Sequence, residues 1–327
     1  MIEIFNRLKN KPNLFAQIII ASLFVNLLAL ATPIYVIQVL QRYVAYGVTS
    51  TLITLIAGII FISIFEFFFR NIRHRMTREI EEENISLADK VLKKLTILKT
   101  SIYSLRSQFN SEAISGHVLA IQNIITATTT LILIDVPFVS VFLIALYLIH
   151  YQLGIIATII IIIPFIISRF YSSDINQKSF NWYLNSMNIS KLYENTTARY
   201  VTIRYFDLID ALKKSWSRTL NNTVEVKEKL EAKKNLLTSL MASTSTFMTI
   251  VIIGWGAVLA VNGDISVGAL IGANILASRA IAPIIRYVQT IELLSKSEKS
   301  FEELNKLLTL PHELQSGTEI KDFEGRI

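Results

Sequence analysis

Two long apolar runs joined by a short polar turn constrain this chain more than any other feature. Residues 236–261 contain no charged side chain, and residues 267–288 contain only Arg279 and Arg286. Each run is about as long as the roughly 20 residues that a helix needs to cross a bilayer. Between them, Asn262-Gly263-Asp264 provides a glycine with the positive φ that a tight reversal requires. The stretch therefore predicts a transmembrane hairpin.

Two features of the second helix of this hairpin indicate contacts with other parts of the chain. Gly268 and Gly272 lie four residues apart, which lets another backbone approach this face closely. Arg279 lies near the middle of the run, where an unpaired charge costs at least about 2.5 kcal/mol. We therefore expect close helix packing at the two glycines and a polar partner for Arg279 elsewhere in the chain.

The rest of the chain extends this pattern. Apolar residues make up 52% of the 327 residues, and the mean hydropathy is +0.48. These values favour a membrane protein over a soluble domain. Because the sequence contains no cysteine, it predicts neither a disulfide framework nor a thiolate metal site. The predicted spans are residues 14–35, 51–69, 130–149, 153–170, 236–261 and 267–288.

Lys and Arg are distributed very unevenly between the two sides of the membrane. The N-terminal segment and the connections on its side carry 24 of these residues, whereas the opposite side carries only Arg42. Basic residues accumulate in cytoplasmic loops, so both termini are predicted to be cytoplasmic and the external loops very short. The net charge of +7 is then explained by membrane topology, and no nucleic-acid partner is expected.

The first 12 residues predict a short interfacial elbow helix, because their apolar side chains share one helical face. A cleaved secretory signal is the alternative. It is disfavoured because the apolar run is too long and continues past Pro33.

Several spans continue into polar sequence without a turn signal. After the second span the helical pattern continues with charged residues. After the sixth span apolar residues keep the three-to-four-residue spacing of a helix face as far as Leu308. Residues 169–235 contain neither Gly nor Pro, which favours two long helices and a turn over a separate globular domain. The turns farthest from the membrane are predicted near residues 103–110 and 202–214. Residues 311–327 are predicted to be a linker.

The sequence contains no catalytic or metal-binding pattern. It lacks a glycine-rich phosphate loop ending in Gly-Lys-Ser/Thr, a His-Glu-x-x-His motif and a Gly-x-Ser-x-Gly elbow. The histidines are scattered without the spacing of metal ligands. No catalytic, cofactor-binding or metal-binding residue is predicted in this chain. The four histidines are His74, His117, His150 and His312.

A few polar residues within the spans are candidates for lining a translocation path. Counting a helix rise of about 1.5 Å per residue places Glu66, Asp135 and Arg279 at a similar depth. We therefore predict that Arg279 pairs with Asp135, Glu66 or both. Such a pair either only holds the bundle together or also lines a substrate path, because charges within a membrane usually face a bundle interior or a cavity. The candidates are Asn26, Glu66, Asp135, Asn274 and Arg279.

Several short sequences, taken in their order along the chain, resemble one transporter family. Together with the six spans and their long cytosolic extensions, they resemble the transmembrane domain of type 1 secretion ABC exporters over nearly the whole chain. Gln41 is a departure, because the family often has an acidic residue there. The sequences are Asn26-Leu-Leu-Ala-Leu-Ala-Thr-Pro33, Val39-Leu-Gln-Arg42, Phe65-Glu-Phe67 with Arg70, Asp135-Val-Pro-Phe138, Val267-Gly-Ala-Leu-Ile271, Ile275-Leu276, Ser278-Arg-Ala280, Ala282-Pro283, Leu310-Pro-His-Glu313 and Glu324-Gly-Arg-Ile327.

The resemblance implies an all-α membrane fold in which residues 13–310 form a six-helix exporter domain. Two copies would surround a central cavity in the bacterial inner membrane, and alternating access driven by ATP would export an unfolded protein. The chain alone would not be an enzyme. ATP and Mg²⁺ would bind a nucleotide-binding domain, fused or separate, that begins where this sequence ends. A periplasmic adaptor and an outer-membrane channel would complete the pathway.

The turns near residues 103–110 and 202–214 would, by the same resemblance, couple the transmembrane domain to the ATPase. The residues expected at this contact are Tyr103, Arg106, Arg204, Tyr205 and Asp207.

Other functions are compatible with parts of this pattern. The same architecture exports peptides, lipids or drugs in other transporters, and a neighbouring adaptor gene would favour protein secretion over these. A scaffold that does not transport, binding a cytosolic partner through residues 169–235, would not co-purify with an ATPase. A secondary transporter is a further alternative, which the long charged extensions do not suit.

Overall fold

The computed structural model describes residue 9, residues 11–97 and residues 111–311, and every regular element in this part is helical. This confirms the predicted all-α fold. The turn predicted near residues 103–110 lies outside the described residues, as does almost all of the predicted elbow helix and linker. The elements are α2 (Pro12–Ala29), α3 (Ala31–Gln38), the π-helical turn η1 (Val39–Val44), α4 (Thr49–Thr96), α5 (Ser111–Ile124), α6 (Ala127–Asp135), α7 (Val139–Ile149), α8 (Tyr151–Ala198), α9 (Tyr200–Tyr205), α10 (Ile209–Val261) and α11 (Val267–Thr309).

Six helical stretches in the described part are long and apolar enough to cross a membrane, as predicted. The first combines α2, α3 and η1, and the third combines α6 and α7. The chain therefore has the composition and helix lengths of a multi-pass membrane protein. The stretches are Pro12–Val44, Thr49–Glu79, Ala127–Ile149, Tyr151–Ser168, Ile209–Val261 and Val267–Thr290.

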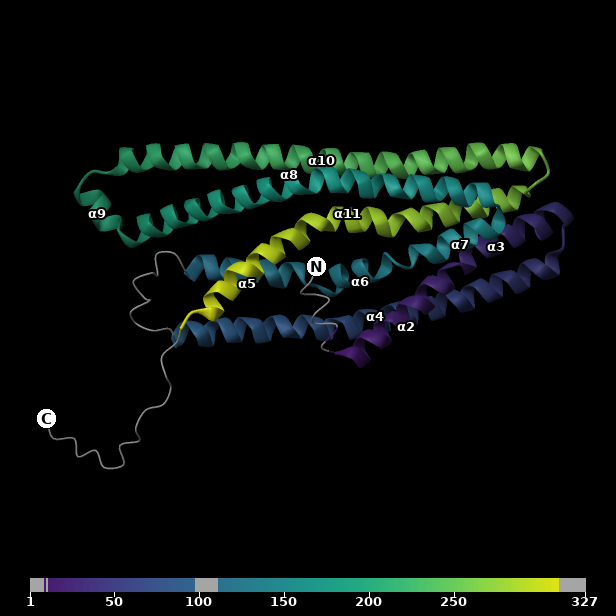
Figure 1. Cartoon of the computed structure of the whole chain (residues 1–327), viewed down its shortest axis with the longest axis horizontal. Coiled ribbons are helices and arrows are strands. Elements are labelled where there is room, and N and C mark those ends of the chain that lie inside the picture. Colours follow the sequence, from purple (N-terminus) through teal and green to yellow (C-terminus); the bar gives the residue numbers. More distant parts are fainter. Residues whose placement is uncertain (1–8, 10, 98–110, 312–327) are drawn as a thin grey trace, which may run out of the picture.

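Four helices are much longer than a membrane crossing needs. Helices α4 and α8 have 48 residues each, α10 has 53 and α11 has 43. At about 1.5 Å per residue, α8 and α10 are more than twice as long as the roughly 30 Å hydrocarbon core of a bilayer. Figure 1 shows α8 and α10 running side by side as an arm, with α9 joining them at the far end. This confirms two long helices and a turn in place of a globular domain.

Helix α11 lies at the centre of the packing. Its Ala277 belongs to an apolar cluster with residues of α7, α8 and α10, whereas its Leu304 belongs to another cluster with residues of α2, α4, α5 and α6. Val288, between them along the helix, packs with the α8–α10 arm. Figure 1 shows α11 crossing from one group of helices to the other. The fold thus has two helical groups that α11 connects.

The predicted hairpin is present and closes as expected. Gly263 has a φ of 84°, and the backbone N–H of Asp264 donates to the Leu259 carbonyl over 3.0 Å. Ser266 then caps α11, because its hydroxyl accepts the N–H of Ala269 at 3.1 Å. The positive φ explains why glycine stands at the reversal.

The two glycines at the start of α11 pack against α3 and η1. A Cβ on Gly268 would lie 3.0 Å from the Ile37 carbonyl oxygen, and a Cβ on Gly272 would overlap the Ile37 side chain. The predicted close approach is therefore confirmed, and the neighbouring helix belongs to the first span. Gln41, one residue before Arg42, adds a polar link to this contact by donating to the Ser266 hydroxyl.

Candidate functional site

A buried ion pair between Arg73 of α4 and Asp135 of α6 forms the centre of the polar network in the described bundle. Arg73 Nη1 lies 2.5 Å from Asp135 Oδ1, and Nη2 lies 3.4 Å from Oδ2. Only 7% of the Arg73 side chain and 14% of the Asp135 side chain are exposed. Two roughly parallel contacts of this kind fix the relative orientation of a guanidinium and a carboxylate. The pair therefore holds α4 and α6 in one register.

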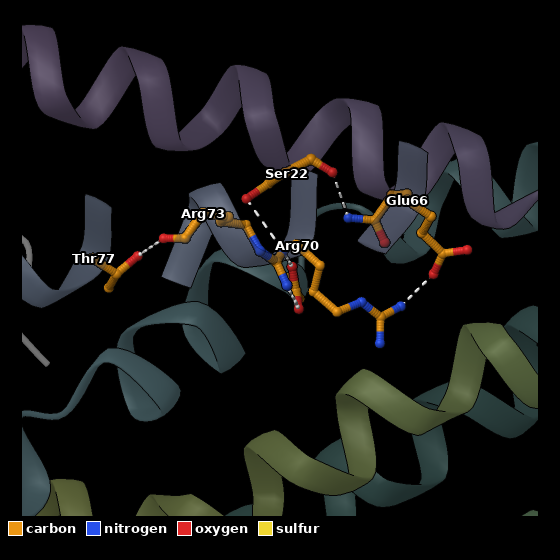
Figure 2. A network of polar contacts seen from close by, with 7 residues as sticks. Ser22, Glu66, Arg70, Arg73 and Thr77 are labelled. Carbon is orange, nitrogen blue, oxygen red and sulfur yellow. Dashed lines mark hydrogen bonds and ion pairs between the residues drawn. The ribbon is translucent and has the colours of Figure 1, made fainter. Parts of the chain in front are cut away.

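Helix α2 joins the same network through Ser22, which also accepts a hydrogen bond from Asn26 of its own helix. Arg73 Nη1 also donates to the Ser22 hydroxyl over 3.3 Å, and Asn26 Nδ2 donates to the Ser22 carbonyl over 2.8 Å. On α4, the Thr77 hydroxyl donates to the Arg73 carbonyl over 2.8 Å. Figure 2 shows Ser22, Arg73 and Thr77 in this arrangement. Three helices thus meet at one arginine.

The position of Asp135 explains why it needs this cation. It is the last residue of α6, and Pro137 prevents the helix from continuing because proline has no backbone N–H. A carboxylate at a helix C-terminus is repelled by the partial negative charge of the last carbonyls. The Arg73 guanidinium offsets this repulsion and replaces the water that the carboxylate loses on burial.

Glu66 forms a separate pair that lies within one helix. Its carboxylate binds Arg70, four residues later on α4, and Arg70 is 53% exposed. Figure 2 shows this pair beside the Arg73 network. Because both side chains belong to α4, the pair does not connect helices.

The predicted pairing of Arg279 with Asp135 or Glu66 is wrong in this structure. Arg279 Nη2 instead lies 3.3 Å from the Thr32 hydroxyl of α3, and among the described residues it makes no ion pair. The depth estimate placed the three charges at a similar level. It did not establish which side of each helix they occupy, and it omitted Arg73 because that residue follows the apolar run of the second span.

The far end of the α8–α10 arm presents aromatic side chains to solvent. Tyr205 at the end of α9 is 85% exposed, and Phe206 is 67% exposed. Asp207 then adopts a φ of 50°, which reverses the chain and is tolerated better by Asp than by most residues. The turn closes when the Leu208 N–H donates to the Ile203 carbonyl over 3.0 Å. The result is a small hydrogen-bonded turn that projects at the tip of the arm.

A pocket of about 450 Å³ lies just behind this tip, between α8 and α10. Tyr193 and Trp216 form one wall, with ring centroids 5.8 Å apart. Further along the arm, Asp174 of α8 binds Lys178 and also Lys233 of α10. The hydrogen bond from Lys233 holds the pKa of Asp174 below its usual value, so the carboxylate keeps its charge at lower pH than an isolated aspartate does.

Comparison with known proteins connects this architecture to one class of transporter. No family model matches the sequence. The chain is 23% identical over 318 residues to the exotoxin translocation ATP-binding protein PaxB of Pasteurella aerogenes, and the match covers 96% of this chain and 43% of PaxB. It is 24% identical to the alpha-hemolysin translocation ATP-binding protein HlyB of Proteus vulgaris, over 93% of this chain and 43% of HlyB. The leukotoxin export ATP-binding protein LtxB of Aggregatibacter actinomycetemcomitans is 22% identical, with coverages of 96% and 45%.

The chain is thus similar, over nearly its whole length, to proteins of type 1 secretion ABC exporters. The predicted resemblance is thereby confirmed. The chain spans less than half the length of the curated relatives it matches. The six apolar helices agree with a match to the transmembrane part of these exporters.

Helix α11 carries polar groups that the Arg73 network does not use. Among the described residues, the Oδ1 atom of Asn274 is buried without a hydrogen-bond partner. Arg279, five residues later, is half-buried and contacts Thr32. These groups retain hydrogen-bonding capacity within the membrane-spanning part of the helix.

Two residues that matter here, Ser22 and Arg73, were not among the sequence candidates. The sequence signal that could have pointed to Arg73 is its partner, Asp135, in the sequence Asp135-Val-Pro-Phe138 that resembles an exporter sequence. An acidic residue within a membrane span needs a cation beside it. Tyr205 and Asp207 do lie at the predicted turn, whereas Tyr103 and Arg106 lie outside the described residues. Within the described residues, no group of three or more His, Cys, Asp or Glu side chains has a geometry that would hold a metal ion.

Proposed function

We propose that this chain is the transmembrane part of an ATP-driven exporter that secretes an unfolded protein. The observation that carries the proposal is the similarity to toxin and hemolysin translocation proteins over at least 93% of the chain. The fold supports it, because four of the six spans continue into helices much longer than a membrane crossing needs. Such helices suit a transporter in which motion outside the membrane opens and closes a path within it.

ATP binding belongs, in this proposal, to a nucleotide-binding domain that is fused to this chain or associates with it. The relatives are named ATP-binding proteins, and the chain matches less than half of each. ATP and Mg²⁺ would be held by that domain, and this chain alone would not hydrolyse ATP. Its sequence contains no Gly-Lys-Ser/Thr phosphate loop.

We assign the contact with the ATPase to the tip of the arm, with Arg204, Tyr205 and Asp207 as contact residues. Exposed aromatic side chains on a well-formed turn suit a docking surface, because they supply large contact area with little loss of conformational freedom. Closure of the ATPase domains would then move α8 and α10 together as a lever. The second contact, with Tyr103 and Arg106, remains a prediction from the sequence.

The intramembrane polar residues divide between two roles in this proposal. Asp135 joins α6 to α4 through Arg73, and Asn26 contributes within α2 by donating to the carbonyl of Ser22, which also contacts Arg73. Asn274 and Arg279 of α11 are the better candidates for lining the translocation path, because their polar atoms have few partners in the described bundle. Glu66 stays a candidate, since its pair with Arg70 does not connect it to another helix.

The remaining parts of the proposal follow from the charge distribution and from the relatives. The bias in Lys and Arg supports cytoplasmic termini in a bacterial inner membrane. A second copy of the chain would complete the twelve-helix transporter. A periplasmic adaptor, an outer-membrane channel and a protein substrate would be its further partners.

Replacing the exposed aromatic side chains at the tip with alanine tests the proposed coupling. In the complete transporter reconstituted in lipid nanodiscs, Tyr205→Ala with Phe206→Ala is expected to lower the rate of ATP hydrolysis about tenfold, because the ATPase loses its buried aromatic contacts. Leu220→Ala is the matched control, since Leu220 is also exposed on the arm but lies away from the tip. Unchanged hydrolysis in the aromatic double variant would contradict coupling through α9.

A further inference from the structure

Helix α6 is fastened to α4 at both of its ends. At its start, the Glu81 carboxylate of α4 accepts the backbone N–H of Ala127. At its end, Arg73 of α4 binds the Asp135 carboxylate. The two α4 residues are eight positions apart and so are the two α6 positions, which corresponds to about 12 Å along each helix. The two contacts therefore join, at both ends, two antiparallel segments of equal length: residues 73–81 of α4 and residues 127–135 of α6.

The charges of this double attachment also match the dipole of α6. A carboxylate lies at its N-terminus, where unpaired N–H groups carry partial positive charge, and a guanidinium lies beside its C-terminal residue. The Thr126 hydroxyl adds a cap by accepting the Thr129 N–H at 3.3 Å. Helix α6 is thus held as a unit on α4 by polar contacts at its two ends.

Helix α7, the other half of the third span, packs with different neighbours. Its Phe142 and Leu146 are buried in the cluster that contains Leu153 of α8 and Ala277 of α11. By contrast, Leu131 of α6 belongs to the cluster formed with α2, α4, α5 and the C-terminal part of α11. The apolar contacts of the third span therefore change from one helical group to the other at residues 136–138.

The backbone at this point is wound differently from the helices on either side. Phe138, Val139, Ser140 and Val141 each donate a backbone N–H to the carbonyl three residues earlier, over 3.0 to 3.3 Å. Pro137 lies within this turn and has no N–H to donate. A tight turn of this kind in the middle of a span is a common location for a hinge.

We propose that the third span is divided between two rigid bodies, with α6 moving with α4, α7 moving with α8 and the part of α11 around Ala277, and a hinge at residues 136–138. The polar attachments at both ends of α6, the change of apolar neighbours and the altered winding lead to this division independently. It makes Arg73 and Glu81 positioning residues for the third span. The inference does not depend on which substrate or ATPase the chain serves.

Distances between spin labels test the division directly. The sequence has no cysteine, so pairs can be introduced at exposed positions without removing native residues. One pair, Asn71→Cys with Thr128→Cys, joins α4 and α6, and a second, Ile144→Cys with Ile166→Cys, joins α7 and α8. Asp135→Leu is expected to roughly double the width of the α4–α6 distance distribution in nanodiscs, because Arg73 is left buried without its partner. The α7–α8 width should not change.

A control and a milder variant complete the experiment. Glu66→Gln removes an ion pair within α4 and should leave both distributions unchanged. Glu81→Ala detaches only the start of α6 and should broaden the α4–α6 distribution less than Asp135→Leu, even if the latter folds poorly. Broadening of both pairs would show that the span moves as one rod, and no broadening of the α4–α6 pair would show that the attachments do not hold α6; either result overturns the proposal.

Discussion

Replacing Gly272 by valine is expected to lower the free energy of unfolding by about 3 kcal/mol, as overpacking a close helix contact does. The new Cβ would overlap the Ile37 side chain and would lie 3.4 Å from the Pro33 carbonyl oxygen, which belongs to the backbone and cannot rotate away. Helix α11 would have to move off α3, separating the first and sixth spans. Unfolding of the purified protein in detergent, followed by tryptophan fluorescence, measures the change.

Gly254→Val provides the matched control for this experiment. Gly254 lies in the α10 span, and a Cβ built there meets nothing within 4 Å. Valine at this position should change stability by less than about 1 kcal/mol, since it replaces a flexible residue in open space. Equal destabilisation by the two variants would mean that the contact between α3 and α11 is not tight.

Breaking the Arg73–Asp135 pair from either side is expected to cost about 3–5 kcal/mol, because the remaining charge stays buried without a partner. Arg73→Leu and Asp135→Leu should therefore each shift unfolding strongly. The double variant is expected to recover most of this loss, since replacing both members of a buried pair by apolar residues is often neutral. The same unfolding assay measures all three.

The recovery in the double variant is what distinguishes an ion pair from two independent packing positions. If the two single losses simply added, the side chains would act separately and the network would not depend on their mutual contact. Arg70→Leu serves as a control, because Arg70 is 53% exposed and its pair with Glu66 lies within one helix. An exposed pair of this kind contributes at most about 1 kcal/mol.

The features that were predictable are those that leave a local pattern in the sequence. Apolar runs mark the spans, Gly263 marks the reversal of the hairpin, and the absence of Gly and Pro marks the long helices of the arm. The spacing of Gly268 and Gly272 indicated a close helix contact but did not identify its partner. That partner, Ile37, lies more than 230 positions earlier in the chain.

The polar network was predictable only in part. Asp135 stood out as an acid within an apolar run, and its depth was estimated from the helix rise. Depth alone does not tell which way a side chain faces, so matching level and charge point to Arg279, which in the structure contacts Thr32 instead. Arg73 follows the apolar run, and α4 must pack against α6 and α2 before it becomes buried. This is a tertiary effect that a single sequence does not record.

We propose that this chain works as half of an ATP-driven exporter. The most direct test is the mass and ATPase activity of the complex isolated from membranes through an affinity tag on this chain. We expect two copies of the chain together with two nucleotide-binding domains, fused or associated, and ATP hydrolysis by the purified complex. A single copy of the chain that isolates without any ATPase would contradict it.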